Sequence, residues 1–431
     1  MAFKLLVIAL ASAALVSAQG PVQCEDMRVR RSAHSLTDSD WQNVQRVLSQ
    51  LHRDGQFGRF ARTHDAVFDN VHGHSAFFPF HRRFVLEFEN LCRQIDPTFT
   101  VPYWDTTQDY RTPESSPILS DWALGGNGEG PDQCLQSGIQ GNWTLGFPNW
   151  HCLRRRFSGG DGTILPWVPA ELMSSFIQKD DRLSDFREHI EFSIHGATHI
   201  GLGGDAGTRH APNDFFFYMH HANIDRLWWQ WQNNPGRLFQ YNGPGSNGEA
   251  QLSDVIPEDR AVSFGNQAVG SVMILGFNGM CYYYDSAPVP PGRYPGESSD
   301  ESSRMKLAPK HHVPVSLSGS SNVANHGLEI ERIHMALDEQ AGLKEFFPKV
   351  AQLEPSRMGI VPHRPGARSN KCGGGSEYRK PSAKHALVYP ARMAQNWVKM
   401  HGFVPERVEK VYRDACRLID LLNNSTYVSP Y

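Results

Sequence analysis

Two clusters of histidines in this sequence have the spacing of metal ligands. In the downstream cluster, His195 and His199 are four residues apart, and the adjacent pair His220 and His221 follows in a phenylalanine-rich run. On a helix, four residues turn through about 400°, so the first two imidazoles lie about 40° apart on one face. His221 and Asp225 share this separation, which would let the carboxylate orient the imidazole. His220 points about 100° away from His221, so we expect at most one of the two to join the same site.

The upstream cluster contains four histidines within eighteen residues, interleaved with phenylalanines. They are His64, His72, His74 and His81. Imidazole suits copper, zinc and iron, and the absence of nearby cysteine pairs in the sequence argues against a thiolate-rich site. An isolated H-x3-H pair is also typical of solvated or core histidines. Two histidine triads far apart in one sequence nevertheless favour a dinuclear metal site between helices.

Both clusters resemble the copper signatures of the tyrosinase, catechol oxidase and molluscan haemocyanin family. The first reads His72-x4-Phe77-Phe78-Pro79-Phe80-His81-Arg82-x2-Val85-x3-Glu89, and the second reads Asp214-x2-Phe217-x3-His221-x3-Asp225. The second departs from the family at one position, because proline is usual where Phe215 stands. The spacing of His64, His72 and His81 is most similar to that of short secreted fungal members.

This resemblance implies a type 3 dinuclear centre with two copper ions. The implied metal ligands are His64, His72, His81, His195, His199 and His221. It also implies a mainly α fold, in which a four-helix bundle with long loops holds the copper and a helical C-terminal region follows. Six neutral imidazoles leave the charge of the metals uncompensated, which favours an anionic bridge between the two ions.

The same resemblance implies roles for residues that are not ligands. Glu191 stands one helical turn before His195, where relatives have a glutamate that holds a water, so it is a candidate to accept a phenolic proton. The alternative is a glutamate on a helix surface. Relatives with strong monophenolase activity often carry asparagine at the position of Gly196, so this glycine predicts a preference for diphenols. Ile200 and Phe217 are further candidates to control the substrate.

Helices must position these residues, and the apolar periodicity predicts several of them. We expect helices over 36–51, around His64 as far as Gly73, from His81 to Gln94, and over 181–199. Residues 106–165 are rich in Gly, Pro, Ser and Asn, so we expect a loop, with His151 in solvent. Two further helices are expected near 329–350 and 392–422. His401 matches no ligand pattern there and is predicted to be structural or solvated.

The chain ends and the cysteines bear on localisation. Lys4, an apolar run and small residues near Ala18 predict a signal peptide over 1–18 and hence a secreted protein. A dicopper domain is expected over 19–286, a Pro- and Ser-rich linker over 287–325, and a helical region over 326–431. Seven cysteines make disulfides permissible. A plausible pairing joins Cys24 to Cys92 and Cys134 to Cys152, although sequence alone does not fix it.

Composition limits the classes of partner. The chain has 431 residues, of which 40% are hydrophobic, and its net charge is -3. A core of this size fits a globular enzyme, and the charge predicts neither nucleic acid nor an acidic membrane surface as partner. The expected partners are a small phenolic substrate and dioxygen. No oligomeric state is predicted.

Three functional classes are compatible with these observations. The first is a secreted type 3 copper oxidase that converts o-diphenols or o-aminophenols to o-quinones with dioxygen, with weak or absent hydroxylation of monophenols. A full tyrosinase is the variant of this class with monophenolase activity. The second is a haemocyanin-like oxygen-binding module, and the third is a degenerate copper or zinc protein. The first is favoured, because the single copper domain with a secretory leader argues against the second class and the presence of all six implied ligands argues against the third.

Overall fold

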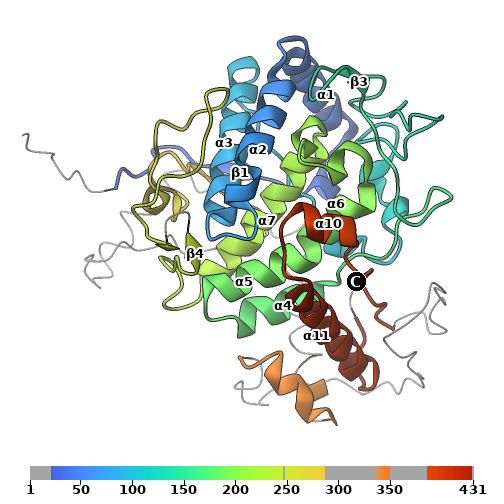
Figure 1. Cartoon of the computed structure of the whole chain (residues 1–431), viewed down its shortest axis with the longest axis vertical. Coiled ribbons are helices and arrows are strands. Elements are labelled where there is room, and N and C mark those ends of the chain that lie inside the picture. The colour runs from blue at the N-terminus through green and yellow to red at the C-terminus, as the bar shows by residue number, and fades with distance from the viewer. Residues whose placement is uncertain are drawn as a thin grey trace, which may run out of the picture.

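The computed structural model describes residues 21–245, 248–286, 333, 336–337, 339–349 and 386–429. The α-helices are α1 (Asp38–Arg53), α2 (Gln56–Val71), α3 (Phe77–Ile95), α4 (Ala170–Lys179), α5 (Leu183–Ile190), α6 (Gly196–Leu202), α7 (Phe216–Gln232), α10 (Gln395–Met400) and α11 (Pro405–Asn423). The strands are β1 (Arg28–Arg30), β2 (Thr144–Leu145), β3 (His151–Cys152), β4 (Pro244–Gly245), β5 (Gly248–Glu249) and β6 (Tyr282–Tyr284). The mainly helical fold predicted from the sequence is confirmed (Figure 1). The predicted signal peptide and linker lie outside the described residues.

The first two predicted helices form for the expected reasons. Thr37 caps α1, because its side chain accepts a hydrogen bond from the Asp40 N–H while Asp40 accepts one from the Thr37 N–H. The apolar stripe of α1 from Trp41 to Leu51 is buried. Helix α2 ends at Val71, and Gly73 follows with a φ of +71°, a left-handed conformation that favours glycine. His64 therefore lies inside α2, and His72 lies just beyond its end.

The third helix begins earlier than predicted. Helix α3 starts at Phe77, so His81 lies in its second turn and not at a helix start. Pro79 lies in the first turn of α3, where proline is tolerated because the N–H it lacks has no partner there. Because the helix starts at Phe77, the carbonyl of that residue lies one turn before His81 and only 2.8 Å from its Nδ1. This contact fixes the orientation of the His81 ring.

The predicted helix over 181–199 is interrupted by a wider turn. Helix α5 ends at Ile190, residues Glu191–His195 form a π-helical turn, and α6 continues from Gly196. π-Helical turns are rare and occur frequently at functional sites. This turn contains Glu191 and His195, two of the predicted site residues.

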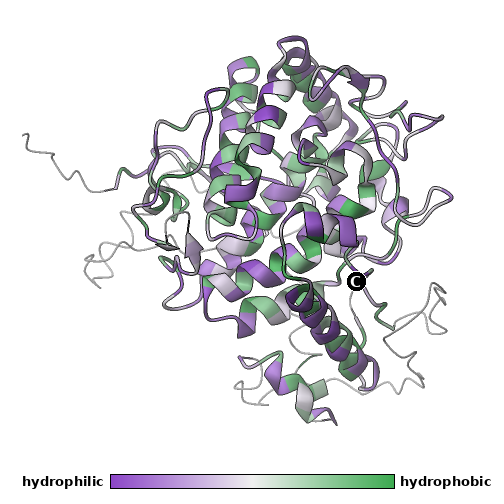
Figure 2. Cartoon of the chain, viewed as in Figure 1, coloured by the Kyte–Doolittle hydropathy of each residue, from purple (hydrophilic) through white to green (hydrophobic). Residues whose placement is uncertain are grey.

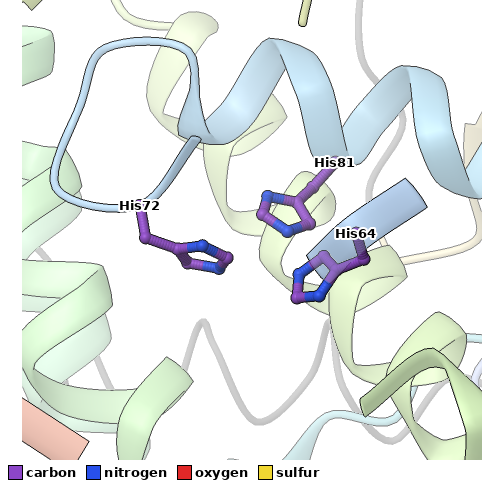
Figure 3. Close-up of side chains that lie close together, drawn as sticks. All are labelled: His64, His72 and His81. Atoms are coloured by element: carbon purple, nitrogen blue, oxygen red, sulfur yellow. The ribbon is translucent and has the colours of Figure 1, made fainter. Parts of the chain in front are cut away.

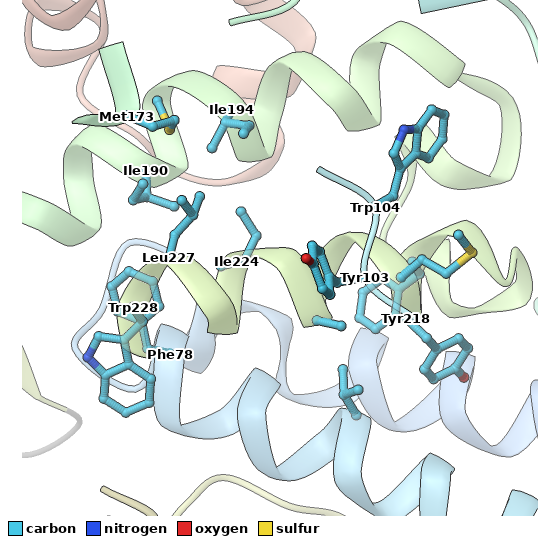
Figure 4. Packing of buried hydrophobic residues seen from close by; sticks show 14 of the residues in the cluster. Phe78, Tyr103, Trp104, Met173, Ile190, Ile194, Tyr218, Ile224, Leu227 and Trp228 are labelled. Carbon is cyan, nitrogen blue, oxygen red and sulfur yellow. The ribbon is translucent and has the colours of Figure 1, made fainter. Parts of the chain in front are cut away.

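The core is formed mainly by α3 and α7, which pack against each other. Nearly every residue of α7 is buried, as expected for a helix with neighbours on all sides. Phe78 of α3 and Trp228 of α7 stack with ring centroids 5.3 Å apart (Figure 4). By contrast, α11 has hydrophilic and hydrophobic faces, as an amphipathic surface helix does (Figure 2). A rigid pair of buried helices thus supports the second histidine cluster.

One predicted disulfide is confirmed and the other is wrong. Cys134 and Cys152 are bonded. Cys24 pairs with Cys281 and not with Cys92, which is a free, buried thiol in α3. The reason is a long-range contact, since β1 pairs in parallel with β6 and brings the N-terminal arm to residue 281. This pairing ties the arm to the end of the predicted dicopper domain.

The C-terminal segment returns to the core. The helix predicted over 392–422 forms as two helices, α10 and α11, separated by Gly402 with a φ of +63°. In Figure 1, α10 lies over α6 and α11 runs beside α4. Among the described residues, no helix combines the length and apolar character needed to cross a bilayer.

Candidate metal centre

The first histidine triad converges as predicted. His64 comes from α2, His72 from the residue after α2, and His81 from α3 (Figure 3). All three are buried, and one nitrogen from each lies within 4.8 Å of the others. His74, the fourth histidine of this cluster, is not in the group. His74 is half-buried and follows the turn at Gly73, and its ring nitrogens do not join those of the other three.

Backbone carbonyls fix the rings of the triad and of His199. The contacts are His64 Nδ1 to Arg209 O at 2.6 Å, His72 Nδ1 to Phe68 O at 3.0 Å, His81 Nδ1 to Phe77 O at 2.8 Å, and His199 Nδ1 to Ala206 O at 2.6 Å. A carbonyl only accepts hydrogen bonds, so Nδ1 carries the proton in each ring and Nε2 presents a lone pair. Nε2 of His64, His81 and His199 is buried without a hydrogen-bond partner in the described part of the chain. This arrangement is the usual one for histidine ligands of a metal.

The second triad forms around His195 and His199. The nitrogen atoms of these two residues group within 4.8 Å of a nitrogen of His220, not of the predicted His221. His221 instead stacks on His81, with ring centroids 3.9 Å apart and planes within 8°. It also lies 5.2 Å from the His195 ring, between the two triads. The structure thus offers two adjacent candidates for the sixth ligand, and our assignment of His221 stays a prediction.

The predicted contact between Asp225 and His221 is wrong. One carboxylate oxygen of Asp225 accepts a hydrogen bond from Arg82 Nε at 2.5 Å, and the other accepts bonds from the hydroxyls of Tyr282 and Tyr284, each at 2.6 Å. Arg82 belongs to α3, and the two tyrosines belong to β6. The carboxylate is therefore saturated by partners distant in sequence. Asp225 thus joins α7 to α3 and to β6, and it does not orient the ring of His221.

The electrostatics of the site suit copper. Burial lowers the pKa of His64 to about 3 and that of His199 to about 4, and it lowers the pKa of His72, His81 and His195 well below the ordinary value. Neutral imidazole is the form that binds metal. Two groups of three buried histidines, four of which have Nδ1 fixed by a backbone carbonyl, fit a pair of copper ions, whose ligands are commonly nitrogen. The donor set thus fits the type 3 dinuclear copper centre implied by the motifs.

Glu191 is fully buried at the start of the π-helical turn. Its carboxylate accepts hydrogen bonds from the Gly73 N–H, at 3.0 and 3.2 Å, and pairs with Arg187 one turn earlier. Burial raises the pKa of Glu191 to about 7, although Arg187 and the Gly73 N–H act in the opposite direction. The surface-glutamate alternative is therefore wrong. Glu191 sits beside the loop that holds His72.

The other predicted substrate-control residues lie around the histidines. Phe217 packs against His221 and His64, with centroid separations of 4.3 and 5.0 Å. Ile200 is half-buried on α6. Gly196 is buried at the start of α6, and a Cβ there would lie 2.5 Å from Met393 Cε and 3.1 Å from Trp397 Nε1. The residue at position 196 is therefore covered by the C-terminal segment.

The departure from the family motif at Phe215 has a structural partner. The Phe215 N–H donates to the side-chain carbonyl of Gln140 at 2.7 Å, a bond that proline could not make. The adjacent Asp214 accepts two hydrogen bonds from Arg155, at 2.7 and 2.8 Å, and one from the Phe216 N–H at the start of α7. These contacts anchor α7 to the loop that precedes it.

The residues that cover the site were not predicted from the sequence. Trp397 of α10 stacks on His199 with ring centroids 5.3 Å apart, and His401 lies 4.9 Å from His72 and 4.7 Å from Phe68. His401 is 7% exposed, and its Nε2 has no hydrogen-bond partner within the residues that the structure describes. Of the two predicted alternatives for His401, structural or solvated, burial excludes the solvated one. Trp397 and His401 are four residues apart, a spacing that could have signalled a shared face.

Comparison with known proteins agrees with this geometry. Residues 54–234, which include all six predicted ligands, match the common central domain of tyrosinase. The tyrosinase of Streptomyces antibioticus is 33% identical over 48% of this chain and 83% of its own length, and tyrosinase ustQ of Aspergillus flavus is 31% identical over 54% and 73%. The structure of a polyphenol oxidase variant from Thermothelomyces thermophila aligns over 60% of this chain and 88% of its own, with 21% identity and a TM-score of 0.48. The chain therefore belongs to the tyrosinase family of type 3 copper phenol oxidases.

Proposed function

We propose that the protein oxidises o-diphenols or o-aminophenols to o-quinone products with dioxygen, and that it hydroxylates monophenols weakly or not at all. The observation that carries this preference is Gly196, which provides no amide beside His195 and Glu191. The Cys24–Cys281 and Cys134–Cys152 disulfides support export, because disulfides persist in oxidising compartments. We propose residues 19–286 as the catalytic domain, 287–325 as a linker and 326–431 as the C-terminal region.

The chain and the metals have separate tasks in this reaction. Two bound copper ions would supply the electron transfer from the diphenol to dioxygen. The histidines would hold the ions, and Phe77 and Phe217 beside their rings keep water away from them. The diphenol must also lose its hydroxyl protons. Glu191 is the candidate acceptor, because burial brings its pKa close to 7, where a general base works well.

The primary test is oxygen uptake by the copper-loaded protein with 4-tert-butylcatechol and with tyramine in parallel. Uptake with the catechol and little or none with tyramine is the expected result. Comparable uptake with both would make the protein a full tyrosinase and overturn the argument from Gly196. The protein would be an oxygen-binding module if it bound oxygen reversibly and oxidised neither phenol, even in a variant whose C-terminal segment no longer covers the histidines.

We expect Glu191→Gln to lower the turnover of 4-tert-butylcatechol by roughly 10²-fold, the lower range of general-base effects. In the parent protein the rate should fall as the pH drops through about 7, because the carboxylate takes up a proton and stops acting as a base. The glutamine variant should lack this dependence. The control is Glu87→Gln, which removes a carboxylate that pairs in the same way with an arginine one turn earlier, Arg83, but lies outside the site. Full copper content and unchanged rates in Glu191→Gln would exclude the base role.

We expect Gly196→Asn to raise the rate on tyramine relative to 4-tert-butylcatechol by severalfold. A side chain at this position must displace Met393, whose Cε lies 2.5 Å from the Cβ position. Gly196→Ala displaces the same atom without adding an amide, so it is the matched control. A higher ratio in the asparagine variant alone would support amide control. Equal ratios in both variants would place control elsewhere, with Ile200 the next candidate.

A further inference from the structure

A third cluster of ligand-type side chains lies apart from the two triads. His151 of β3, Asp205 and His210 bring one ligand atom each to within 4.8 Å of one another. His151 Nε2 is 2.8 Å from Asp205 Oδ1, and His210 Nε2 is 3.6 Å from the same oxygen. The carboxylate is buried, and the side chain of His151 is 6% exposed. The proposed oxidase reaction uses none of these residues.

The contacts of His151 call for a positive charge in this cluster, and the hydrogen bond with Asp205 accordingly raises the pKa of His151. Its Nδ1 lies 2.8 Å from the Asn149 carbonyl, which only accepts, so Nδ1 carries the proton of the neutral ring. Its Nε2 then presents a lone pair to the Asp205 carboxylate at 2.8 Å. Two electron-rich atoms at this distance require a positive charge between them. That charge is a second proton on His151 or a metal ion.

His210 brings a second imidazole to the same carboxylate. Burial lowers the pKa of His210, and a neutral imidazole has one ring nitrogen that can bind a metal ion. Two imidazoles and a carboxylate are a common zinc donor set, with bonds near 2.0–2.1 Å and ligand atoms about 3.3 Å apart in a tetrahedron. The distances of 2.8 and 3.6 Å lie on either side of that value. Small side-chain shifts would therefore complete three ligand positions.

The chain around the cluster is already fixed. The Cys134–Cys152 disulfide holds the residue next to His151. Asp205 Oδ2 accepts a hydrogen bond from the Arg154 N–H at 2.9 Å, and Asn213 Nδ2 donates to the Phe147 carbonyl at 2.9 Å and to Asp205 Oδ1 at 3.3 Å. These contacts join the disulfide loop to residues 203–213. A buried carboxylate held by backbone and amide donors is a preformed ligand.

The position of the cluster links it to the histidine triads. Residues 203–213 provide the carbonyls of Ala206 and Arg209, which fix the rings of His199 and His64. Asp205 and His210 are each adjacent in sequence to one of these carbonyls. An ion bound between the two loops would therefore hold in place the two carbonyls that accept hydrogen bonds from His199 and His64, one ligand of each triad.

We propose that His151, Asp205 and His210 form a third metal site, which binds one divalent transition ion such as Zn²⁺ and fastens the disulfide loop to residues 203–213. The ion has a structural role and stays outside the oxidase reaction. It replaces the proton between His151 and Asp205. The site depends on residues that the proposed function does not use, so it stands even if the diphenol preference fails.

The test starts from full-length protein whose dinuclear centre is already loaded with copper. The protein is equilibrated with one equivalent of Zn²⁺ per chain and desalted, and both metals are counted by mass spectrometry. We expect about one zinc per chain beside two coppers. His210→Ala should lower zinc retention at least tenfold and keep both coppers. The control His34→Ala removes an imidazole that pairs with the carboxylate of Asp109 and does not belong to this cluster, so it should retain the zinc.

A second measurement requires no variant. X-ray absorption at the zinc edge of the parent protein should show nitrogen and oxygen neighbours near 2.0–2.1 Å with scattering from two imidazoles. Zinc should also raise the melting temperature of the parent protein and not that of His210→Ala. Absence of zinc beside two coppers, zinc that displaces copper, or equal retention in His210→Ala would each overturn the proposal.

Discussion

Replacing His221 with alanine is expected to remove one of the two copper ions and to abolish oxidase activity, whereas His220→Ala should keep both ions. The motif assigns His221 as the sixth ligand, since it stands four residues before Asp225 and four after Phe217. The copper count per chain, measured after equilibration with excess copper and desalting, distinguishes the two variants directly. Activity should follow the count, because both ions take part in the proposed reaction.

The positions of the two rings give a physical reason for this expectation. The two ions of a dinuclear site share a bridge, so each ligand set must face the other. His221 lies between the triads, 3.9 Å from the His81 ring and 5.2 Å from the His195 ring. His220 stacks on Phe216 at 5.2 Å and lies 5.0 Å from His199. His220 also brings a nitrogen to within 4.8 Å of nitrogens of His195 and His199, so both neighbouring rings are within reach and the copper count decides between them.

The reverse result would be equally informative. One copper in His220→Ala and two in His221→Ala would make His220 the sixth ligand, as its grouping with His195 and His199 suggests, and would make the motif assignment wrong. His74→Ala is a suitable control, because this half-buried histidine belongs to neither triad. It should keep both ions. Loss of copper in this control as well would point to a general effect on folding.

The local elements and the first triad could be predicted because neighbouring residues determine them. The N-cap of Thr37, the apolar face of α1 and the left-handed turn at Gly73 are properties of short stretches. His64 and His81 lie on helices whose buried faces are visible in the sequence pattern. The π-helical turn at Glu191 was not predictable in this way. Its wider turn lies inside a continuous helical pattern and leaves no local signal.

Contacts between distant residues account for most of the errors. The Cys24–Cys281 disulfide depends on the pairing of β1 with β6, and the partners of Asp225 come from α3 and β6. An i, i+4 spacing shows that two side chains share a helix face, but it does not show which other elements compete for them. His151 was assigned to solvent for the same reason. Its partner Asp205 is 54 residues away.

Loosening α10 is expected to raise oxidase activity, because this helix covers the histidines in the structure. Trp397 stacks on His199, and His401 contacts His72 and Phe68. Phe403 continues this cover against Phe192, with ring centroids 4.6 Å apart. A bulky phenol has to reach ligands that these side chains now contact. The segment must therefore move before the substrate binds.

The double variant Trp397→Ala, His401→Ala removes the contacts with the ligands and keeps α11 in place. Helix α11 is held separately, by its buried apolar face and by the ion pair of Arg407 with Glu188. If the covered form makes up about 90% of the molecules, its release raises the apparent rate on the order of tenfold at low substrate concentration. The measurement is kcat/KM for 4-tert-butylcatechol in copper-loaded protein, with the copper content of each variant determined in parallel.

Lys399→Ala is the matched control, because Lys399 lies on α10 and its side chain is exposed. It should leave kcat/KM unchanged. An unchanged value in the double variant, with two coppers present, would show that the substrate reaches the site past Trp397 and His401 without moving them. A lower value would show instead that these side chains help to bind the phenol. The expected rise, confined to the variant that loses the contacts with His199 and His72, would identify α10 as the barrier to the substrate.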